Sequence, residues 1–363
     1  MKILRPIAVL VSCLIWTANA SAQISLTPPA AQTPPAASKP VAKPNPKPAA
    51  VAKKPAPVAA PKPAPAATPK PVPATTVTPA PVPDDPNVDL VFGAYQRGYY
   101  KTAFDLATKR VQDTGDPKAM AMLGELYANA MGVKRDDAKA ADWYKRAADG
   151  GDREGMFALA MLRLSGRGGP ANREEAVKLL ASSAKLGNPK AAYNLALLYL
   201  DGQTLPQDVR RAAELFRVAA DAGSPEAQYA LATFYKEGTG VPKDLEKAIG
   251  LLQAASLADN VDAEVEYAIA LFNGTGTPKN EAAAVALLRK AAKQNSPIAQ
   301  NRLARVLVSG LGAPMDKIEG LKWHIVAKTA GKGDPMLDEA LADLSPEDRA
   351  KAQAAARLWL GTK

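Results

Sequence analysis

The chain offers few residues that could do chemistry, and the first candidates are one histidine and one cysteine. His324 is the only histidine and Cys13 the only cysteine among 363 residues. A protein zinc site needs three or four ligands, usually histidine and cysteine, and neither residue has a second of its kind. His324 also lies 36 residues after Leu288, and this spacing predicts a packing role. We therefore expect no catalytic residue, no metal site and no cofactor.

Two glycine pairs bear a partial likeness to a phosphate-binding loop. They are Gly238 with Gly240 and Gly274 with Gly276. A phosphate loop joins a strand to a helix and ends in Gly-Lys-Ser/Thr, and neither pair has that context. Because the pairs stand one 36-residue period apart, they indicate turns.

The elements that position these residues repeat every 36 residues from 119 to 331, through six copies without insertion or deletion. Residues at the same position of each copy form a column. One column consists of small residues and is followed four residues later by a column of mostly bulky residues, so both lie on one face of an amphipathic helix. A second pair of columns, which begins at Ala140 and Trp143 in the first copy, predicts a second helix in each copy. The first two columns comprise Ala119, Gly155, Ala191, Ala227, Ala263 and Ala299, and then Leu123, Leu159, Leu195, Leu231, Tyr267 and Leu303.

Residues that begin and end helices recur at the same period. Each predicted first helix follows a side chain that can accept hydrogen bonds from the free N–H groups of its first turn. These capping residues are Asp116, Asp152, Asn188, Ser224, Asn260 and Ser296. Glycines such as Gly187 precede the cap, and others such as Gly166 separate the two helices. The local signals agree with one global pattern, which indicates a repeat array.

The repeat resembles a known family. The first copy reads Ala119, Leu123, Gly124 and Tyr127, followed by Gly132, Val133, Asp136, Lys139, Ala140, Trp143, Tyr144, Ala147, Ala148 and Gly151. This motif is similar to the SEL-one-like repeat, a longer-looped relative of the tetratricopeptide repeat. The resemblance implies an all-α fold, an α/α superhelical solenoid of antiparallel helix pairs with a concave face. The sequence departs from the motif in the fourth and fifth copies, where Asp259 and Asn295 replace the closing glycine.

We divide the chain into five segments. Residues 1–22 read as a signal peptide, 23–83 as a disordered Pro/Ala/Lys-rich linker, and 84–114 as a degenerate tetratricopeptide-like N-terminal cap. Residues 115–333 hold the six repeats and 334–363 the C-terminal capping helices. In the last segment Ala352, Ala355, Ala356, Leu358 and Trp359 are expected to cover the open end of the array.

The N-terminal residues predict export. Lys2 and Arg5 precede an apolar run over residues 7–16, and Ala20-Ser21-Ala22 fits a signal-peptide cleavage site. The expected location is the periplasm or the exterior, with no cysteine in the mature chain. The alternative is a lipobox over residues 10–13, which would make the protein a membrane-anchored lipoprotein through Cys13.

The positive charge of the chain is concentrated near its N-terminus. The net charge is +10, but nine of the 46 basic residues precede residue 84, which leaves 37 against 36 acids in the remainder. Seven lysines and no acid lie in residues 23–83. The near-neutral repeats exclude a basic nucleic-acid surface, so we expect no nucleic acid partner. The linker either contacts cell wall or anionic lipid weakly or is only a soluble spacer.

The concave face is the candidate binding site. By analogy with tetratricopeptide arrays, the second and sixth residues after each first-column residue are expected to point toward the concave face. Together they form a strip along the first helices, which in the fifth copy contains Val265 and Ile269. The predicted protein- or peptide-binding residues are Phe157, Met161, Tyr193, Leu197, Tyr229, Thr233, Asn301 and Arg305. The strip would form an apolar groove with a polar end, suited to a peptide or helix. The alternative is that its tyrosines only pack between repeats.

Three functions follow from these observations. The leading hypothesis is an exported, non-enzymatic scaffold or adaptor of the bacterial cell envelope that binds an envelope protein or peptide and no small-molecule substrate. The second is a structural envelope protein whose basic tail binds the wall or anionic lipid. The third is an enzyme that binds or hydrolyses β-lactams, as in cysteine-rich relatives, although the regular cysteine pairs of those relatives are absent here.

Overall fold

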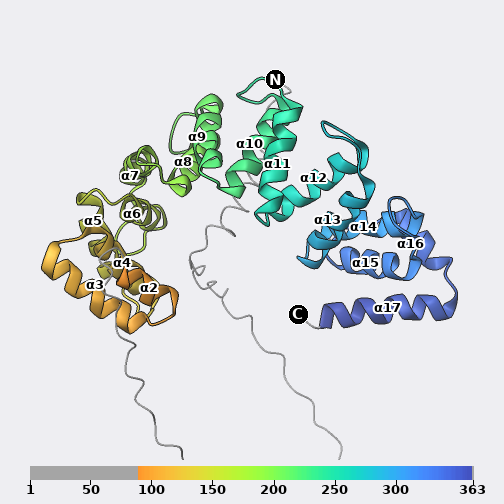
Figure 1. Ribbon diagram of the computed structural model, residues 1–363, viewed down its shortest axis with the longest axis horizontal. Helices are drawn as coiled ribbons and strands as arrows, with labels where there is room; N and C mark the ends of the chain where they lie inside the picture. Colours follow the sequence, from red (N-terminus) through yellow and green to blue (C-terminus); the bar gives the residue numbers. More distant parts are fainter. Residues whose placement is uncertain (1–88, 362–363) are drawn as a thin grey trace, which may run out of the picture. The chain divides into compact units, whose positions relative to one another are not determined.

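The computed structural model describes residues 89–361, which form sixteen α-helices and no strand. Twelve of the helices make six consecutive antiparallel pairs (Figure 1). The pairs are α4 (Pro117–Ala128) with α5 (Asp137–Asp149), α6 (Arg153–Ser165) with α7 (Arg173–Lys185), α8 (Pro189–Asp201) with α9 (Val209–Asp221), α10 (Pro225–Glu237) with α11 (Leu245–Leu257), α12 (Val261–Asn273) with α13 (Glu281–Lys293), and α14 (Pro297–Ser309) with α15 (Lys317–Thr329). The expected all-α repeat solenoid is confirmed.

The helix ends lie where the capping residues predict them. The side chain of Asn188 accepts a hydrogen bond from the N–H of Ala191 at 3.0 Å, and each of the other five predicted first-helix caps also accepts from the first turn. At the closing-glycine column, Asp259 (φ +61°) and Asn295 (φ +70°) adopt the left-handed conformation that Gly187 (φ +83°) has in its copy. The repeat geometry therefore persists where the sequence departs from glycine.

Small residues let the helices approach closely. The alanines that begin the second-helix columns, such as Ala140, Ala176 and Ala212, are completely buried. A Cβ atom on Gly124 would lie 2.6 Å from the ring of Tyr144, so no larger residue fits there without a shift. The bulky columns fill the remaining space, with Leu123 and Leu303 at most 1% exposed. These contacts make one continuous stack from copy to copy.

The loops between helices also join neighbouring copies. Gly240 has φ +69°, and a Cβ atom on it would lie 2.7 Å from the backbone oxygen of Val209 in the preceding copy. Gly276 approaches Leu245 in the same way, with a distance of 2.9 Å from its would-be Cβ to Leu245 Cγ. The two Gly-Thr-Gly segments are therefore turns with a packing role, as the period predicted.

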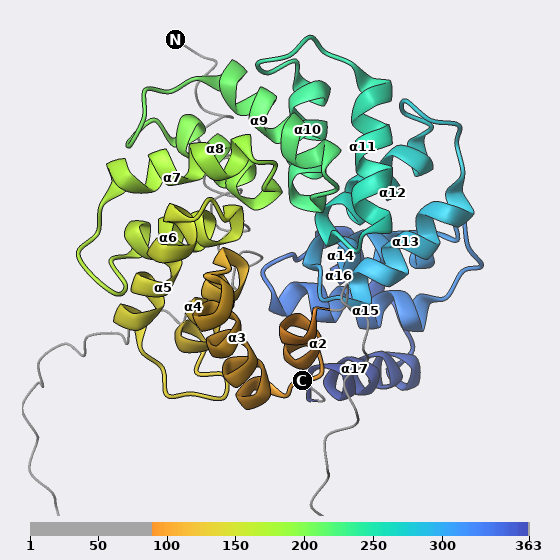
Figure 2. The same cartoon turned by 60° about the vertical axis from the view of Figure 1, so that its left-hand side comes forward.

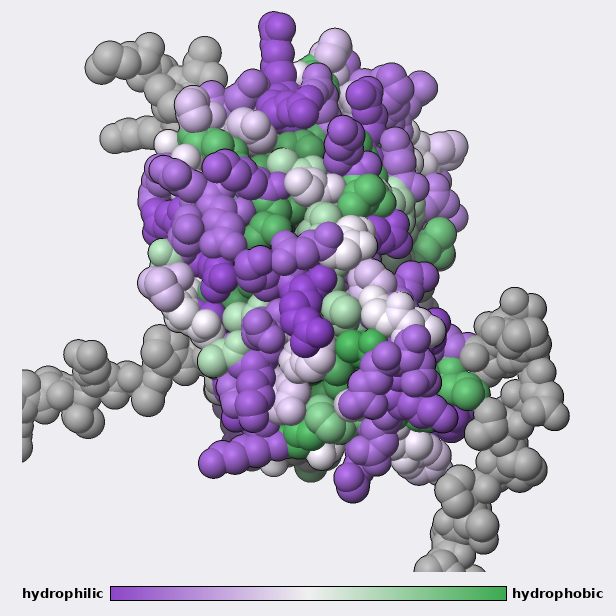
Figure 3. Space-filling model, turned by 90° about the vertical axis from the view of Figure 1, so that its left-hand side faces the viewer, coloured by the Kyte–Doolittle hydropathy of each residue, from purple (hydrophilic) through white to green (hydrophobic). Residues whose placement is uncertain are grey.

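The helix pairs within residues 89–361 follow a curved path (Figures 1 and 2). In both views the first helices α4, α6 and α8 lie nearer the inside of the curve, and the second helices α5, α7 and α9 lie outside. Seen from the side of the N-terminal pairs, the surface carries hydrophilic ridges separated by small hydrophobic areas (Figure 3). The first helices therefore form the concave side of the stack (Figures 1 and 2).

Additional helices cover both ends of the array. The pair α2 (Leu90–Gln96) and α3 (Tyr100–Thr114) packs on α4, and α16 (Pro335–Ala342) and α17 (Pro346–Gly361) pack on α15. Ala352 and Ala356 of α17 are fully buried, but Leu358 is 69% exposed. The prediction that Leu358 covers the end was wrong, because it points away from the α15 surface that the alanines contact. None of the helices in this part of the chain is both long and apolar enough to cross a bilayer.

The expectations for residues 1–22 and 23–83, and that for Cys13, lie outside the described residues.

Candidate functional site: the inner face of the first helices

Three of the predicted binding residues lie inside the stack. Tyr193 is 6% exposed, Leu197 is 7% exposed and Thr233 is 8% exposed. A partner that lies on the inner face would reach little of these side chains. They do not form the open apolar groove that the sequence suggested.

Tyr193 packs between repeat copies. Its ring centroid lies 5.5 Å from that of Phe216 on α9, and Phe216 in turn makes an edge contact with Phe234 on α10. Burial raises the pKa of the Tyr193 hydroxyl above its ordinary value. Of the two roles considered for this tyrosine, binding a partner or packing between repeats, its surroundings are those of packing, because the rotation of α8 directs its side chain toward α9.

Three other predicted residues remain partly open. Phe157 on α6, Met161 one turn later, and Tyr229 on α10 are all half-buried. Phe157 and Tyr229 pack against the apolar core that Tyr193 and Phe216 share. Only part of each side chain is available to a partner, so the first helices of copies two and four expose small apolar areas.

The predicted polar end of the strip is occupied by the chain itself. Arg305 on α14 donates a hydrogen bond to the carboxylate of Asp334 at 2.5 Å, and the Asn301 amide lies 3.4 Å from the same carboxylate. Asp334 is 3% exposed and its other oxygen accepts from the N–H of Met336, which begins α16. Asn301 and Arg305 therefore hold the C-terminal cap in place.

The pKa of Asp334 lies below its ordinary value. Burial raises this pKa, but it is outweighed by the hydrogen bond and positive charge of Arg305 together with the hydrogen bonds from Asn301 and the Met336 N–H. The carboxylate is therefore charged at neutral pH and neutralises Arg305.

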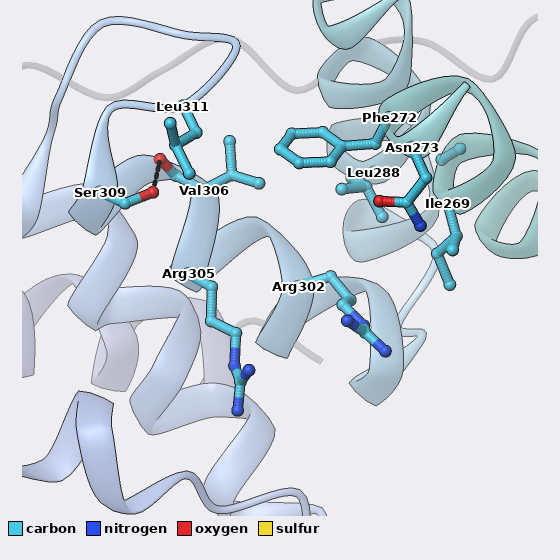
Figure 4. A pocket seen from close by; sticks show the side chains of 10 residues that line it. Ile269, Phe272, Asn273, Leu288, Arg302, Arg305, Val306, Ser309 and Leu311 are labelled. Carbon is cyan, nitrogen blue, oxygen red and sulfur yellow. Dashed lines mark hydrogen bonds between the residues drawn. The ribbon is translucent and has the colours of Figure 1, made fainter. Parts of the chain in front are cut away.

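An open hollow lies between the first helices of copies five and six (Figure 4). It has a volume of about 170 Å³ and is lined from α12, α13, α14 and the loop after α14. The lining residues are Ala268, Ile269, Phe272, Asn273, Leu288, Arg302, Arg305, Val306, Ser309 and Leu311. The lining is mostly apolar and contains no acidic residue. Arg302 and Arg305 of α14 lie on one side of the hollow, and Arg302 supplies its positive charge because Arg305 is paired with Asp334.

The sequence predicted only part of this hollow. Ile269 and Arg305 belong to the predicted inward positions, but Phe272, Arg302 and Leu311 were not singled out. Arg302 directly follows Asn301, and Phe272 lies one turn after Ile269. A helical wheel of α12 and α14 that includes the neighbouring inner positions would have found both. Leu311 lies in a loop, and the period alone does not fix its direction.

His324 is in the packing column, as expected. It is completely buried, and its Nε2 lies 2.9 Å from Asp338 Oδ1 on α16. Lys328 donates to the same carboxylate oxygen at 2.7 Å. Within residues 89–361 no cluster of histidine, cysteine and acidic residues has the arrangement of a metal site.

The fold and the inner face define the class of protein: an α/α repeat solenoid whose stacked pairs present the first helices along one side. The chain belongs to the Sel1 repeat family. The family model matches six consecutive segments, residues 117–152, 153–188, 189–224, 225–260, 261–296 and 297–332. Sel1 repeat proteins are generally scaffolds for protein interaction and are typically not enzymes.

Solved structures of Sel1 repeat proteins are similar to this chain. A Sel1 repeat protein from Oxalobacter formigenes is 26% identical with a TM-score of 0.59, and the match covers 66% of this chain and 98% of the other. A protective antigen of uropathogenic Escherichia coli with an SLR fold is 25% identical with a TM-score of 0.52, covering 72% of this chain and 64% of the other. A comparison with curated proteins gave no match.

Proposed function

We propose that this protein is an exported scaffold of the bacterial cell envelope that binds a segment of a partner protein on the inner face of its first helices. The observation that carries the proposal is the open, mostly apolar hollow between α12 and α14. Phe157, Met161 and Tyr229, which are half-buried on the first helices of copies two and four, add smaller apolar areas. Concave sites with apolar walls and a few polar groups are the common form of a binding pocket. A rigid stack keeps such a surface preformed, which lowers the entropy cost of binding.

The proposed location rests on the sequence of residues 1–22. A positive start, an apolar run and Ala20-Ser21-Ala22 support cleavage after residue 22. Intact mass and N-terminal sequencing of protein from envelope fractions test this proposal. A first residue at Gln23 is expected, or at Ser21 if the second cleavage site, Ala18-Asn19-Ala20, is used. A lipid-modified Cys13 or an unprocessed chain would contradict the proposal.

The proposed role of residues 23–83 is reach, with weak attraction to anionic wall polymers or lipid headgroups as a second contribution. The support is the charge distribution: seven lysines and no acid in this segment, beside a nearly neutral remainder. Electrostatic attraction of this kind weakens as the Debye length falls to about 8 Å at physiological ionic strength.

The experiment compares two fragments of the chain across a salt series. Residues 84–363 and residues 23–83 are each incubated with detergent-solubilised envelope extract and with purified cell wall. We expect the repeat array to retain a defined envelope protein at physiological salt and the linker to retain only wall, at low salt. Capture of the same protein by the linker alone would overturn the assignment of recognition to the array.

A further inference from the structure

We propose that the hollow between α12 and α14 binds a partner segment in which a bulky apolar side chain lies close to an aspartate or glutamate. The inference rests on the proposed scaffold function and adds the chemistry of the partner.

The charge comes from Arg302. Its side chain is exposed at the hollow and has no ion pair or hydrogen bond within residues 89–361. Arg305, about one turn further along α14, is already paired with Asp334. Since no acidic residue lines the hollow, Arg302 is the guanidinium that remains available. A carboxylate is its natural partner, because the two groups can form a pair of parallel hydrogen bonds.

The apolar part lies opposite the arginines. Phe272 and Leu311 face one side of the hollow, and Arg302 and Arg305 extend toward the other (Figure 4). Leu311 is 54% exposed although it is a large apolar residue. The volume of about 170 Å³ is close to that of cavities of about 150 Å³ that accept a benzene ring. One leucine or phenylalanine side chain therefore fits.

The helix polarity fixes how such a segment lies. α12 ends at Asn273 and α14 ends at Ser309, so the apolar side of the hollow is next to two helix C-termini. Helix C-termini carry partial negative charge and disfavour an anion. The acidic residue of the partner therefore points toward Arg302, two turns earlier on α14, and the apolar residue points toward Phe272.

The carboxylate is a side chain rather than a chain terminus. Capture of a C-terminal carboxylate in proteins commonly uses a nest of free backbone N–H groups. The walls here are the middle and last turns of α12 and α14, whose N–H groups are consumed in helix hydrogen bonds. The linker of the same chain is also not complementary, because residues 23–83 contain seven lysines and no acid.

The test uses the full mature chain and three sets of fluorescent octapeptides, built on glycine and serine. The first set is blocked at both ends and carries one leucine or phenylalanine with a glutamate one to four residues away. The second set has glutamine in place of glutamate. The third has glutamine and a free C-terminal carboxylate. Fluorescence anisotropy gives the dissociation constants for the wild type, Arg302→Gln, Phe272→Ala and, as a matched control, Arg217→Gln, an exposed arginine on α9.

We expect the best glutamate peptides to bind about tenfold more tightly than their glutamine partners, which corresponds to about 1.4 kcal/mol. Arg302→Gln should remove this preference and Arg217→Gln should keep it. Phe272→Ala should weaken binding of the first two sets alike. Circular dichroism melts confirm that each variant is folded.

Four results would overturn the inference: equal binding of the first two sets, a preference that survives Arg302→Gln, tighter binding of the third set, or no binding at all. The scaffold function is judged separately. If glutamine peptides bind as tightly as glutamate peptides and Ile269→Glu abolishes both, the inner face still binds peptides and only the acidic partner is wrong. Absence of binding to any peptide, together with no inner-face contact to a partner in cells, would remove both proposals.

Discussion

Gly168 lies directly against the backbone of Asp137, so that a Cβ atom on this glycine would stand 2.2 Å from the Asp137 backbone oxygen. Asp137 is the first residue of α5 in one copy, and Gly168 is in the loop between the two helices of the next. The neighbouring Arg167 donates to the Asp137 carboxylate at 2.7 Å. The register between copies is thus fixed by loops as well as by helix faces.

Gly168→Ala should destabilise the array more than Gly223→Ala. Both glycines have positive φ, +70° and +87°, so alanine at either position costs roughly 1–2 kcal/mol of backbone strain. Only at Gly168 does the added methyl also meet backbone, since nothing lies within 4 Å of a Cβ on Gly223. Urea denaturation midpoints compare the two variants. Equal shifts would mean that the loop contact does not restrain the stack.

Leu195→Ala or Leu231→Ala should each lower the free energy of unfolding by about 2–5 kcal/mol. Leu195 is 5% exposed and Leu231 is 3% exposed, so truncation leaves a cavity between helices. Leu257→Ala is the control, because that side chain is 79% exposed. Thermal and urea unfolding should show little change for Leu257→Ala, and a loss as large as that of the buried leucines would refute the assigned register.

Tyr193→Ala should reduce stability by about 3–5 kcal/mol, whereas Tyr193→Phe should be nearly neutral. The ring packs on Phe216, and phenylalanine retains that contact. Loss of partner binding in Tyr193→Ala would therefore report a loosened stack. A Tyr193→Ala variant that melts like the wild type but binds a partner less well would restore this tyrosine to the binding surface.

Asp334→Asn should loosen the C-terminal cap in a pH-dependent way. The pKa of Asp334 is lowered in the folded state, so its stabilising contribution is complete above the unfolded carboxyl pKa of about 3.9 and is lost as the pH falls through the folded value. We expect a loss of about 1 kcal/mol at pH 7, modest because the Arg305 side chain is 49% exposed.

The difference between Asp334→Asn and the wild type should shrink as the pH falls below about 3.9. Hydrogen exchange of the α16 amides, at pH 7 and at a pH below about 3.9, measures this difference. The control is Asp343→Asn, because Asp343 is an exposed acid directly after α16. A constant difference across pH would show that the Asp334 charge is not the cause.

The sequence predicts the repeats well because one 36-residue pattern is written six times. Small columns, caps and glycines each specify the same helix pair, and Ala140, Asn188 and Gly166 behave as expected. The inner face was harder to predict. Whether Tyr193 points into the groove or toward α9 depends on the rotation of α8 within the stack, which period alone does not determine.

The role of Arg305 could not be read from the sequence for a related reason. Its partner Asp334 lies in the cap, two residues beyond the position that continues the 36-residue series of capping residues at Lys332. Because of this two-residue shift, the side chain that pairs with Arg305 on α14 is the acidic Asp334 and not Lys332. Arg302, about one turn earlier on α14, has no acidic partner within residues 89–361 and is the unpaired cation at the hollow.

The central claim is that recognition takes place on the inner face of the first helices, and site-specific photo-crosslinking in living cells tests it most directly. A benzophenone amino acid is introduced at Met161 or Ile269 on the inner face and, for comparison, at Val218 on α9 or Gln253 on α11. Val218 is 45% exposed and Gln253 is exposed, so both outer probes are accessible. We expect a defined partner adduct from Met161 and Ile269 and none from the two outer positions. Adducts that form only at Val218 or Gln253 would contradict the account.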